Sequence, residues 1–138
     1  MTLSYSDFQI TTNFNTKEFH CKSGIKVPHQ YIANVVYVAT QLQRIRWKLG
    51  NCTIYINSAY RTKQHNDSIG GVPKSNHLTA SAVDIRTQKY TANELHSKLK
   101  TLINDGVIPK GELIRYATFV HYAPEYNLKF TSEIEPYF

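Results

Sequence analysis

The sequence lacks the features that define several protein classes. No apolar run approaches the ~20 residues of a membrane-spanning helix, so we expect no membrane insertion. The N-terminal residues do not have the basic-then-apolar pattern of a signal peptide, which predicts synthesis in the cytoplasm. Cysteine is scarce: Cys21 and Cys52 are too few for a disulfide framework and lie too far apart for a paired-cysteine zinc motif. We expect both to be small buried side chains rather than a bridge.

Clusters of basic residues are also missing, although the chain is positively charged. It has 16 Lys and Arg against 10 Asp and Glu, a formal net charge of +6. Such a charge favours a polyanionic partner: nucleic acid, a membrane surface or a cell-wall polymer. The one short basic group, Arg44, Arg46 and Lys48, is interpreted as the solvated face of a helix. Because no zinc-finger, helix-turn-helix or RNP pattern is present, we expect no nucleic-acid partner.

What is present is the composition of a folded protein. Hydrophobic residues make up 41% and charged residues 19% of the chain, which excludes a disordered class. There is no linker, repeat or low-complexity tract, so residues 1–138 are predicted to form one domain, which we expect to be a monomer. Residues 1–27 are expected to be irregular and to anchor in the core through Phe8, Phe14 and Phe19.

Apolar spacing predicts two main helices and a short sheet. A helix is expected at about 28–49, where apolar residues recur every three or four positions and Gly50 follows. A second helix is expected from the capping box Thr91–Glu94 to Gly106. Strands are predicted at 53–58 and 81–85, with a long loop between them, and a hairpin at 112–116 and 119–122. Together these elements predict an α+β domain with a short antiparallel sheet.

The main functional signal lies in two short stretches that contain histidine and aspartate. One runs from Ser75 through His77 to Asp84, and the other is Phe119-Val-His121-Tyr. A histidine–aspartate pair alone is more simply interpreted as a satisfied histidine and a structural aspartate. His121 changes that balance, because a histidine that faces into an apolar sheet needs a partner and a metal supplies one. Two imidazoles and a carboxylate are the ligand set of a catalytic zinc that keeps its fourth position open. We therefore predict that Zn²⁺ binds there.

Two further residues are candidates for the same site. Arg61 follows the first predicted strand, where an arginine often pairs with a surface carboxylate. Beside a metal it could instead hold a substrate carboxylate through two parallel hydrogen bonds. His65 is a reserve candidate that could orient a metal ligand. The remaining histidines, at positions 20, 29 and 96, have no sequence context that suggests a partner.

These motifs resemble a known family. The pattern is Ser75-x-His77-x-x-Ala80-x-Ala82-x-Asp84, preceded by Ser58-Ala-Tyr-Arg61 and followed by Phe119-Val-His121. It resembles the zinc D-alanyl-D-alanine carboxypeptidases, which are grouped with bacteriophage endolysins, vancomycin-resistance dipeptidases and the hedgehog signalling domain. The resemblance extends from about Asn13 to about Tyr122. It implies a hedgehog-like, DD-peptidase-like fold, zinc ligation by His77, Asp84 and His121, and a substrate-binding role for Arg61.

The chain departs from the family pattern at three positions. The family usually has glycine where this chain has Ala80, and alanine would be strained there if that glycine has positive φ. Relatives often end the last motif with His-x-Asp, whereas this chain has Ala123. The dipeptidase branch places a glutamate three residues before the final histidine, at the position of Thr118. The general base is therefore not visible in the expected places.

Glu112 is our first choice for that base, because it opens the hairpin that carries His121. Glu125 is the rival on the other flank. For each of them, an exposed surface acid is the simpler interpretation.

The resemblance implies a zinc-dependent peptidase that hydrolyses peptidoglycan stem peptides, either as a D-Ala-D-Ala carboxypeptidase or as an L-Ala-D-Glu endopeptidase. Its small size and the lack of a signal sequence suggest a phage-encoded protein that acts at the bacterial cell wall. The alternative is a non-catalytic homologue that binds peptidoglycan or a protein partner, as the hedgehog branch does by resemblance. The missing base favours that alternative.

Overall fold

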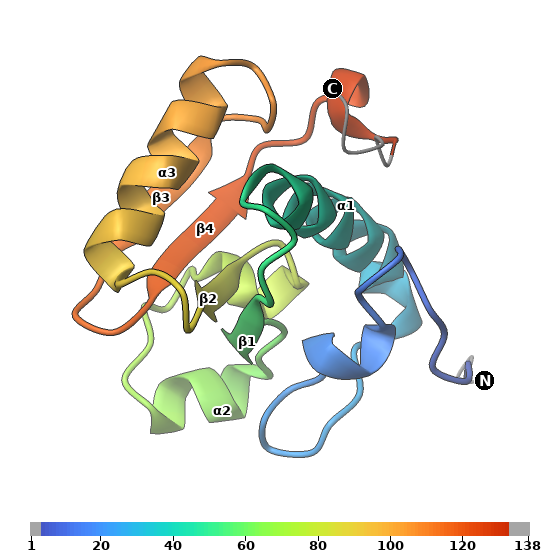
Figure 1. The fold of residues 1–138 in the computed structure, drawn as a ribbon. Coiled ribbons are helices and arrows are strands. Elements are labelled where there is room, and N and C mark those ends of the chain that lie inside the picture. Colours follow the sequence, from blue (N-terminus) through green and yellow to red (C-terminus); the bar gives the residue numbers. More distant parts are fainter. Residues whose placement is uncertain (1–3, 133–138) are drawn as a thin grey trace.

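The computed structural model describes residues 4–132. It consists of one β-sheet with helices packed against it (Figure 1). The sheet has four antiparallel strands in the order β1-β2-β4-β3. The strands are β1 (Tyr55–Ser58), β2 (Val83–Arg86), β3 (Gly111–Arg115) and β4 (Val120–Pro124). The α-helices are α1 (Ile32–Lys48), α2 (Lys63–Ser68) and α3 (Ala92–Asn104). The predicted α+β class and the hairpin are confirmed.

The two long helices cover the sheet and form the core with it. Helix α3 lies along β3 and β4, and α1 crosses β4 near its end (Figure 1). Leu42 and Ile45 of α1, Leu99 of α3, and Ile85 and Tyr122 of the central strands are completely buried in one cluster. Burial of each such side chain stabilises the folded protein by roughly 1.5–3 kcal/mol. The central strands therefore belong to the well-packed core of the fold. No helix within residues 4–132 is both long and apolar enough to cross a membrane.

The ends of the helices follow local signals. Helix α3 begins at the predicted capping box: Glu94 N donates to Thr91 Oγ1 at 3.1 Å, and Thr91 N donates to Glu94 Oε1 at 2.9 Å. The predicted start of α1 at position 28 is too early. A separate 3₁₀ turn, His29–Tyr31, precedes the α-helix, and Pro28 caps that turn.

The interpretation of Arg44 as a solvated residue is wrong, because it is 2% exposed. Its Nη1 donates to the carbonyl of Val107 at 2.8 Å, and its Nη2 donates to the carbonyl of Ser132 at 2.9 Å. Arg46 is half-buried and Lys48 is exposed, so only the end of the helix behaves as predicted. Arg44 instead ties α1 to the C-terminal segment.

The N-terminal segment also differs in part from expectation. Phe14 and Phe19 are buried anchors, but Phe8 is 40% exposed and does not anchor the chain. Both cysteines are free thiols, but only Cys21 is buried as expected, because Cys52 is half-buried.

The predicted long loop between β1 and β2 contains two short helices that were not predicted. Helix α2 has only six residues and is capped by Thr62, whose side chain accepts from the backbone N–H of His65. A 3₁₀ turn, Asn76–Thr79, follows. Both are too short and too polar to produce an apolar repeat in the sequence. They determine where the functional side chains of this segment lie.

Candidate metal centre

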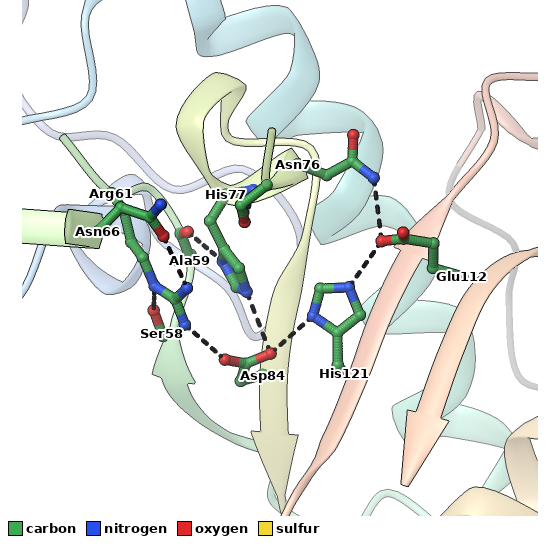
Figure 2. A network of polar contacts seen from close by, with 10 residues as sticks. Ser58, Ala59, Arg61, Asn66, Asn76, His77, Asp84, Glu112 and His121 are labelled. Atoms are coloured by element: carbon green, nitrogen blue, oxygen red, sulfur yellow. Dashed lines mark hydrogen bonds and ion pairs between the residues drawn. The ribbon is translucent and has the colours of Figure 1, made fainter. Parts of the chain in front are cut away.

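Three elements bring His77, Asp84 and His121 together. Asp84 on β2 and His121 on β4 are direct partners across the antiparallel ladder, so their side chains lie on one face of the sheet. His77 approaches that face from the 3₁₀ turn (Figure 2). One ligand atom from each of the three residues lies within 4.8 Å of the others, and all three residues are buried. The structure thus assembles the predicted set from positions far apart in the sequence.

His77 is held in one orientation by its own loop. The hydroxyl of Ser75 accepts from the backbone N–H of His77, and the turn ends at Ala80 in the left-handed conformation, with φ 59°. Nδ1 of His77 lies 2.6 Å from the carbonyl oxygen of Ala59. Because a carbonyl oxygen only accepts, Nδ1 carries the proton and the lone pair of Nε2 faces Asp84 Oδ1 at 3.1 Å.

His121 has the reverse orientation. Its Nδ1 lies 2.9 Å from Asp84 Oδ1, and its Nε2 lies 2.9 Å from Glu112 Oε1. When Nε2 donates its hydrogen to the Glu112 carboxylate, the lone pair of Nδ1 faces Asp84. A metal-binding histidine usually donates its other ring N–H to a carboxylate or a carbonyl. Here the acceptor is the Ala59 carbonyl for His77 and the Glu112 carboxylate for His121.

These donor atoms fit a metal ion. In the tautomers described above, two nitrogen lone pairs and the Oδ1 atom of Asp84 converge on one point, and acceptors that face each other require a cation or protons among them. Two imidazoles and a carboxylate form the ligand set of open catalytic zinc sites. The two histidine nitrogens lie 3.1 Å and 2.9 Å from Asp84 Oδ1, separations that one ion with Zn–N and Zn–O bonds of ~2 Å can bridge.

The charges of the site follow from these contacts. Burial alone would raise the pKa of Asp84. Without a metal, the facing ring nitrogens carry protons instead, and hydrogen bonds from His121 and His77, together with their charges, lower the pKa of Asp84 to about 2. Burial lowers the pKa of His121, but the hydrogen bonds to Asp84 and Glu112 outweigh it and raise that pKa. Without a metal, Asp84 is therefore ionised at neutral pH and attracts a proton to His121.

Arg61 lies directly behind Asp84. Its Nη2 donates to Asp84 Oδ2 at 3.0 Å, its Nε to Ser58 Oγ at 3.0 Å and its Nη1 to Asn66 Oδ1 at 3.2 Å. The side chain is only 13% exposed. Arg61 thus lines the same cleft as the three ligand candidates, and it fixes the carboxylate of Asp84 so that Oδ1 faces the histidines (Figure 2).

Asn66 is a supporting residue to which the sequence assigned no role. It is fully buried, it accepts from Arg61, and its Nδ2 donates to the carbonyl of Val72 at 2.9 Å. A Cβ atom at Gly71 would lie 2.0 Å from Asn66 Oδ1, so this position requires glycine. The sequence predicted only a long loop for this segment, so Asn66 could not be placed without helix α2.

The two base candidates lie in different surroundings. Glu112 on β3 contacts His121 and also accepts from Asn76 Nδ2 at 3.0 Å, while its side chain remains 52% exposed. The hydrogen bonds from His121 and Asn76 lower its pKa. Glu125 lies beyond the end of β4, is exposed and does not line the cleft. Thr118 is exposed in the hairpin turn.

The other histidines lie outside the cleft. His65 is on α2 and lines a separate hollow with Thr62 and Ser23. The expectation that His20 lacks a partner is wrong, because its Nε2 lies 2.6 Å from Asp7 Oδ1. That contact joins two parts of the N-terminal segment, and neither residue lines the cleft.

A family model described as peptidase M15 matches residues 6–123. The match covers most of the chain and includes all three ligand candidates and Arg61. Searches of curated proteins and of solved structures found no match. Peptidases of this family are zinc-dependent, in agreement with the buried His-Asp-His group. The chain therefore belongs to the peptidase M15 family.

Proposed function

We propose that this protein is a zinc-dependent peptidase that cleaves peptide bonds of the bacterial cell wall. The observation that carries the proposal is the convergence of His77 Nε2, Asp84 Oδ1 and His121 Nδ1 at the floor of an open cleft. The cleft has a volume of about 390 Å³, which is within the usual range for small-ligand sites. A purely structural histidine cluster would not need access to such a cleft.

In this proposal the three donor atoms hold zinc, and the surrounding groups keep them in place. Bound zinc supplies Lewis acidity towards a peptide carbonyl and lowers the pKa of a water to ~7. The Ala59 carbonyl orients His77, and Arg61 orients Asp84. A guanidinium has five N–H groups, of which three serve protein acceptors here, so Arg61 retains donors for a substrate oxygen in the cleft.

Glu112 is the proposed proton acceptor. Its lowered pKa keeps it ionised at neutral pH, as a base must be. Oε1 is occupied by His121 and Asn76, but Oε2 forms no hydrogen bond within residues 4–132. Because half of the side chain is exposed, that second oxygen is available to a reacting group in the cleft.

The proposed substrate is the stem peptide of peptidoglycan, cleaved at D-Ala-D-Ala or at L-Ala-D-Glu. The resemblance of the motifs to cell-wall peptidases supports this choice, and so does the net charge of +6, which favours an anionic wall polymer. Action at the cell wall and a phage origin are part of the same proposal.

Metal analysis combined with digestion of purified peptidoglycan tests the proposal. We expect one zinc per chain and peptide fragments whose masses identify the cleaved bond. Asp84→Asn is the matched control, since it keeps the shape but removes the charged ligand and should lose both zinc and cleavage. A zinc-loaded protein that leaves peptidoglycan intact would favour the binding-module alternative, and a protein without zinc affinity would overturn the proposal.

A further inference from the structure

The charges that line the metal cleft are paired, with one exception. Arg61 pairs with Asp84, and Glu112 pairs with His121. Lys74 also lines the cleft and is exposed, and its ammonium has no hydrogen bond or ion pair within residues 4–132. The cleft therefore presents one uncommitted charge, and that charge is positive.

Arg61 is poorly placed to be the main anchor of a substrate carboxylate. Each of its three nitrogens already donates to a protein oxygen, and it is 13% exposed. Two parallel bonds to a substrate carboxylate would compete with its hold on Asp84. Lys74 has no such commitment, and an ammonium offers three donors.

The backbone around Lys74 is fixed relative to the metal centre. The N–H of Ser75 donates to the carbonyl of Val72 at 3.1 Å and closes a turn that contains Lys74. The same carbonyl accepts from Asn66, which also holds Arg61. Lys74 thus starts from a loop that is tied to the site at both ends, and its flexible side chain extends from a defined position.

Apolar side chains form the walls of this cleft. Ile69 and Val72 lie on the loop side and are 53% and 67% exposed. Ile114 and Tyr116 lie on the hairpin side and are 41% and 45% exposed. The Tyr116 ring stacks on Phe119 with centroids 4.7 Å apart. Exposed apolar side chains that gather around a polar floor indicate a binding surface rather than ordinary surface scatter.

We propose that Lys74 is a specificity-determining residue that pairs with a carboxylate of the substrate, while the apolar walls contact its aliphatic groups. The preferred ligand is then a short peptide that has a free carboxylate near the bond to be cleaved. This inference rests on the proposed function and narrows its substrate class. It assigns carboxylate recognition to Lys74 and leaves Arg61 to hold Asp84 and contact the substrate through its remaining N–H groups.

The test uses one pair of peptides and the zinc-loaded protein. The probes are N-acetyl-L-Ala-γ-D-Glu-L-Lys-D-Ala-D-Ala and the same peptide with both carboxylates converted to amides. Calorimetry measures binding and mass spectrometry measures cleavage. We expect the wild type to prefer the acid by about fivefold in Kd or KM, the size expected for a partly exposed ion pair, and the preference to shrink as salt is raised.

Lys74→Met should remove this preference, because it keeps the length of the side chain without its charge. Lys74→Arg should retain it. Lys100→Met on α3 is the matched control, since it makes the same charge change at an exposed position outside the cleft and should behave as the wild type.

Equal binding of acid and amide by the wild type, or an unchanged preference in Lys74→Met, would overturn the role of Lys74. Absence of binding by either peptide would overturn it as well. Failure of the proposed function has a different signature: the wild type would prefer the acid in binding but would cleave neither peptide and no peptidoglycan.

Discussion

Glu112 and His121 are joined by a hydrogen bond of 2.9 Å that leads away from the metal position. The bond uses Nε2 and leaves Nδ1 to face Asp84, so Glu112 determines which nitrogen His121 presents. The same carboxylate oxygen accepts from Asn76, the neighbour of His77. Glu112 therefore connects the strand of one ligand candidate to the loop of another.

Two variants of Glu112 separate proton acceptance from positioning. In Glu112→Gln the amide oxygen can still accept from His121 Nε2, so zinc affinity should change little, but kcat should fall by ~10²-fold or more because the base is lost. Glu112→Ala removes both functions and should also weaken zinc binding by ~10–100-fold. Chelator competition and peptide hydrolysis measure the two effects. Full hydrolysis by Glu112→Gln would exclude Glu112 as the base. Glu125→Gln is the control and should hydrolyse peptide as the wild type does.

Arg61→Lys tests the geometry of the guanidinium at constant charge. A lysine cannot contact Ser58, Asn66 and Asp84 together, so Asp84 and the loop of Asn66 should both loosen. We expect lower kcat/KM and weaker zinc binding. Lys63→Met removes an exposed pair with Asp67 and should leave both quantities unchanged. Wild-type kinetics in Arg61→Lys would show that the three contacts have no functional role.

Position 80 should tolerate glycine but not a β-branched residue. Ala80 has φ 59° and ψ 30°, a conformation that is a genuine outlier for valine. We expect Ala80→Val to lower the free energy of unfolding by ~2 kcal/mol or more, through backbone strain and crowding of a buried position. Ala80→Gly should stay within ~1 kcal/mol of the wild type, because relief of strain offsets the entropy of glycine. Urea denaturation measures the stability of both variants. An Ala80→Val protein as stable as Ala80→Gly would contradict the left-handed conformation at this position.

The zinc-free and zinc-loaded proteins should respond to pH in opposite directions. The raised pKa of His121 contributes stability to the zinc-free protein below the ordinary pKa of 6.5, and this contribution is lost as pH rises through the raised value. Zinc must displace that proton, so zinc affinity should increase over the same interval. Thermal unfolding with and without zinc, at several pH values, measures the difference. His121→Asn should abolish the contrast, and parallel pH profiles in the wild type would refute it.

The sequence predicted those elements of the fold that depend on interactions between neighbouring residues. The capping box at Thr91 and the β3–β4 hairpin depend on neighbouring residues, so the sequence was sufficient for both. The motif around His77 and Asp84 indicated the cluster only together with His121 and through its resemblance to a known family.

What the sequence could not provide depends on distant contacts. Arg44 has the charge of a surface residue, yet it is buried and donates to the carbonyls of Val107 and of Ser132, the latter 88 positions away. Asn66 is one of many polar residues in a polar segment, and its importance appears only when α2 turns it towards Arg61 and Val72. Phe8 is as apolar as Phe14 and Phe19, yet it is 40% exposed while they are buried, a difference that residue type alone cannot predict.

The strand order has a consequence for biosynthesis. Strand β4 is the latest of the four in the sequence, yet it lies between β2 and β3. Until β4 has been made, Asp84 lacks its cross-strand partner His121, and β2 and β3 expose edges that can pair with other chains. In the proposed zinc site, capture of the metal by the full ligand set would therefore have to wait for the insertion of β4 with His121, so that zinc uptake by a nascent chain would report that β4 is in place.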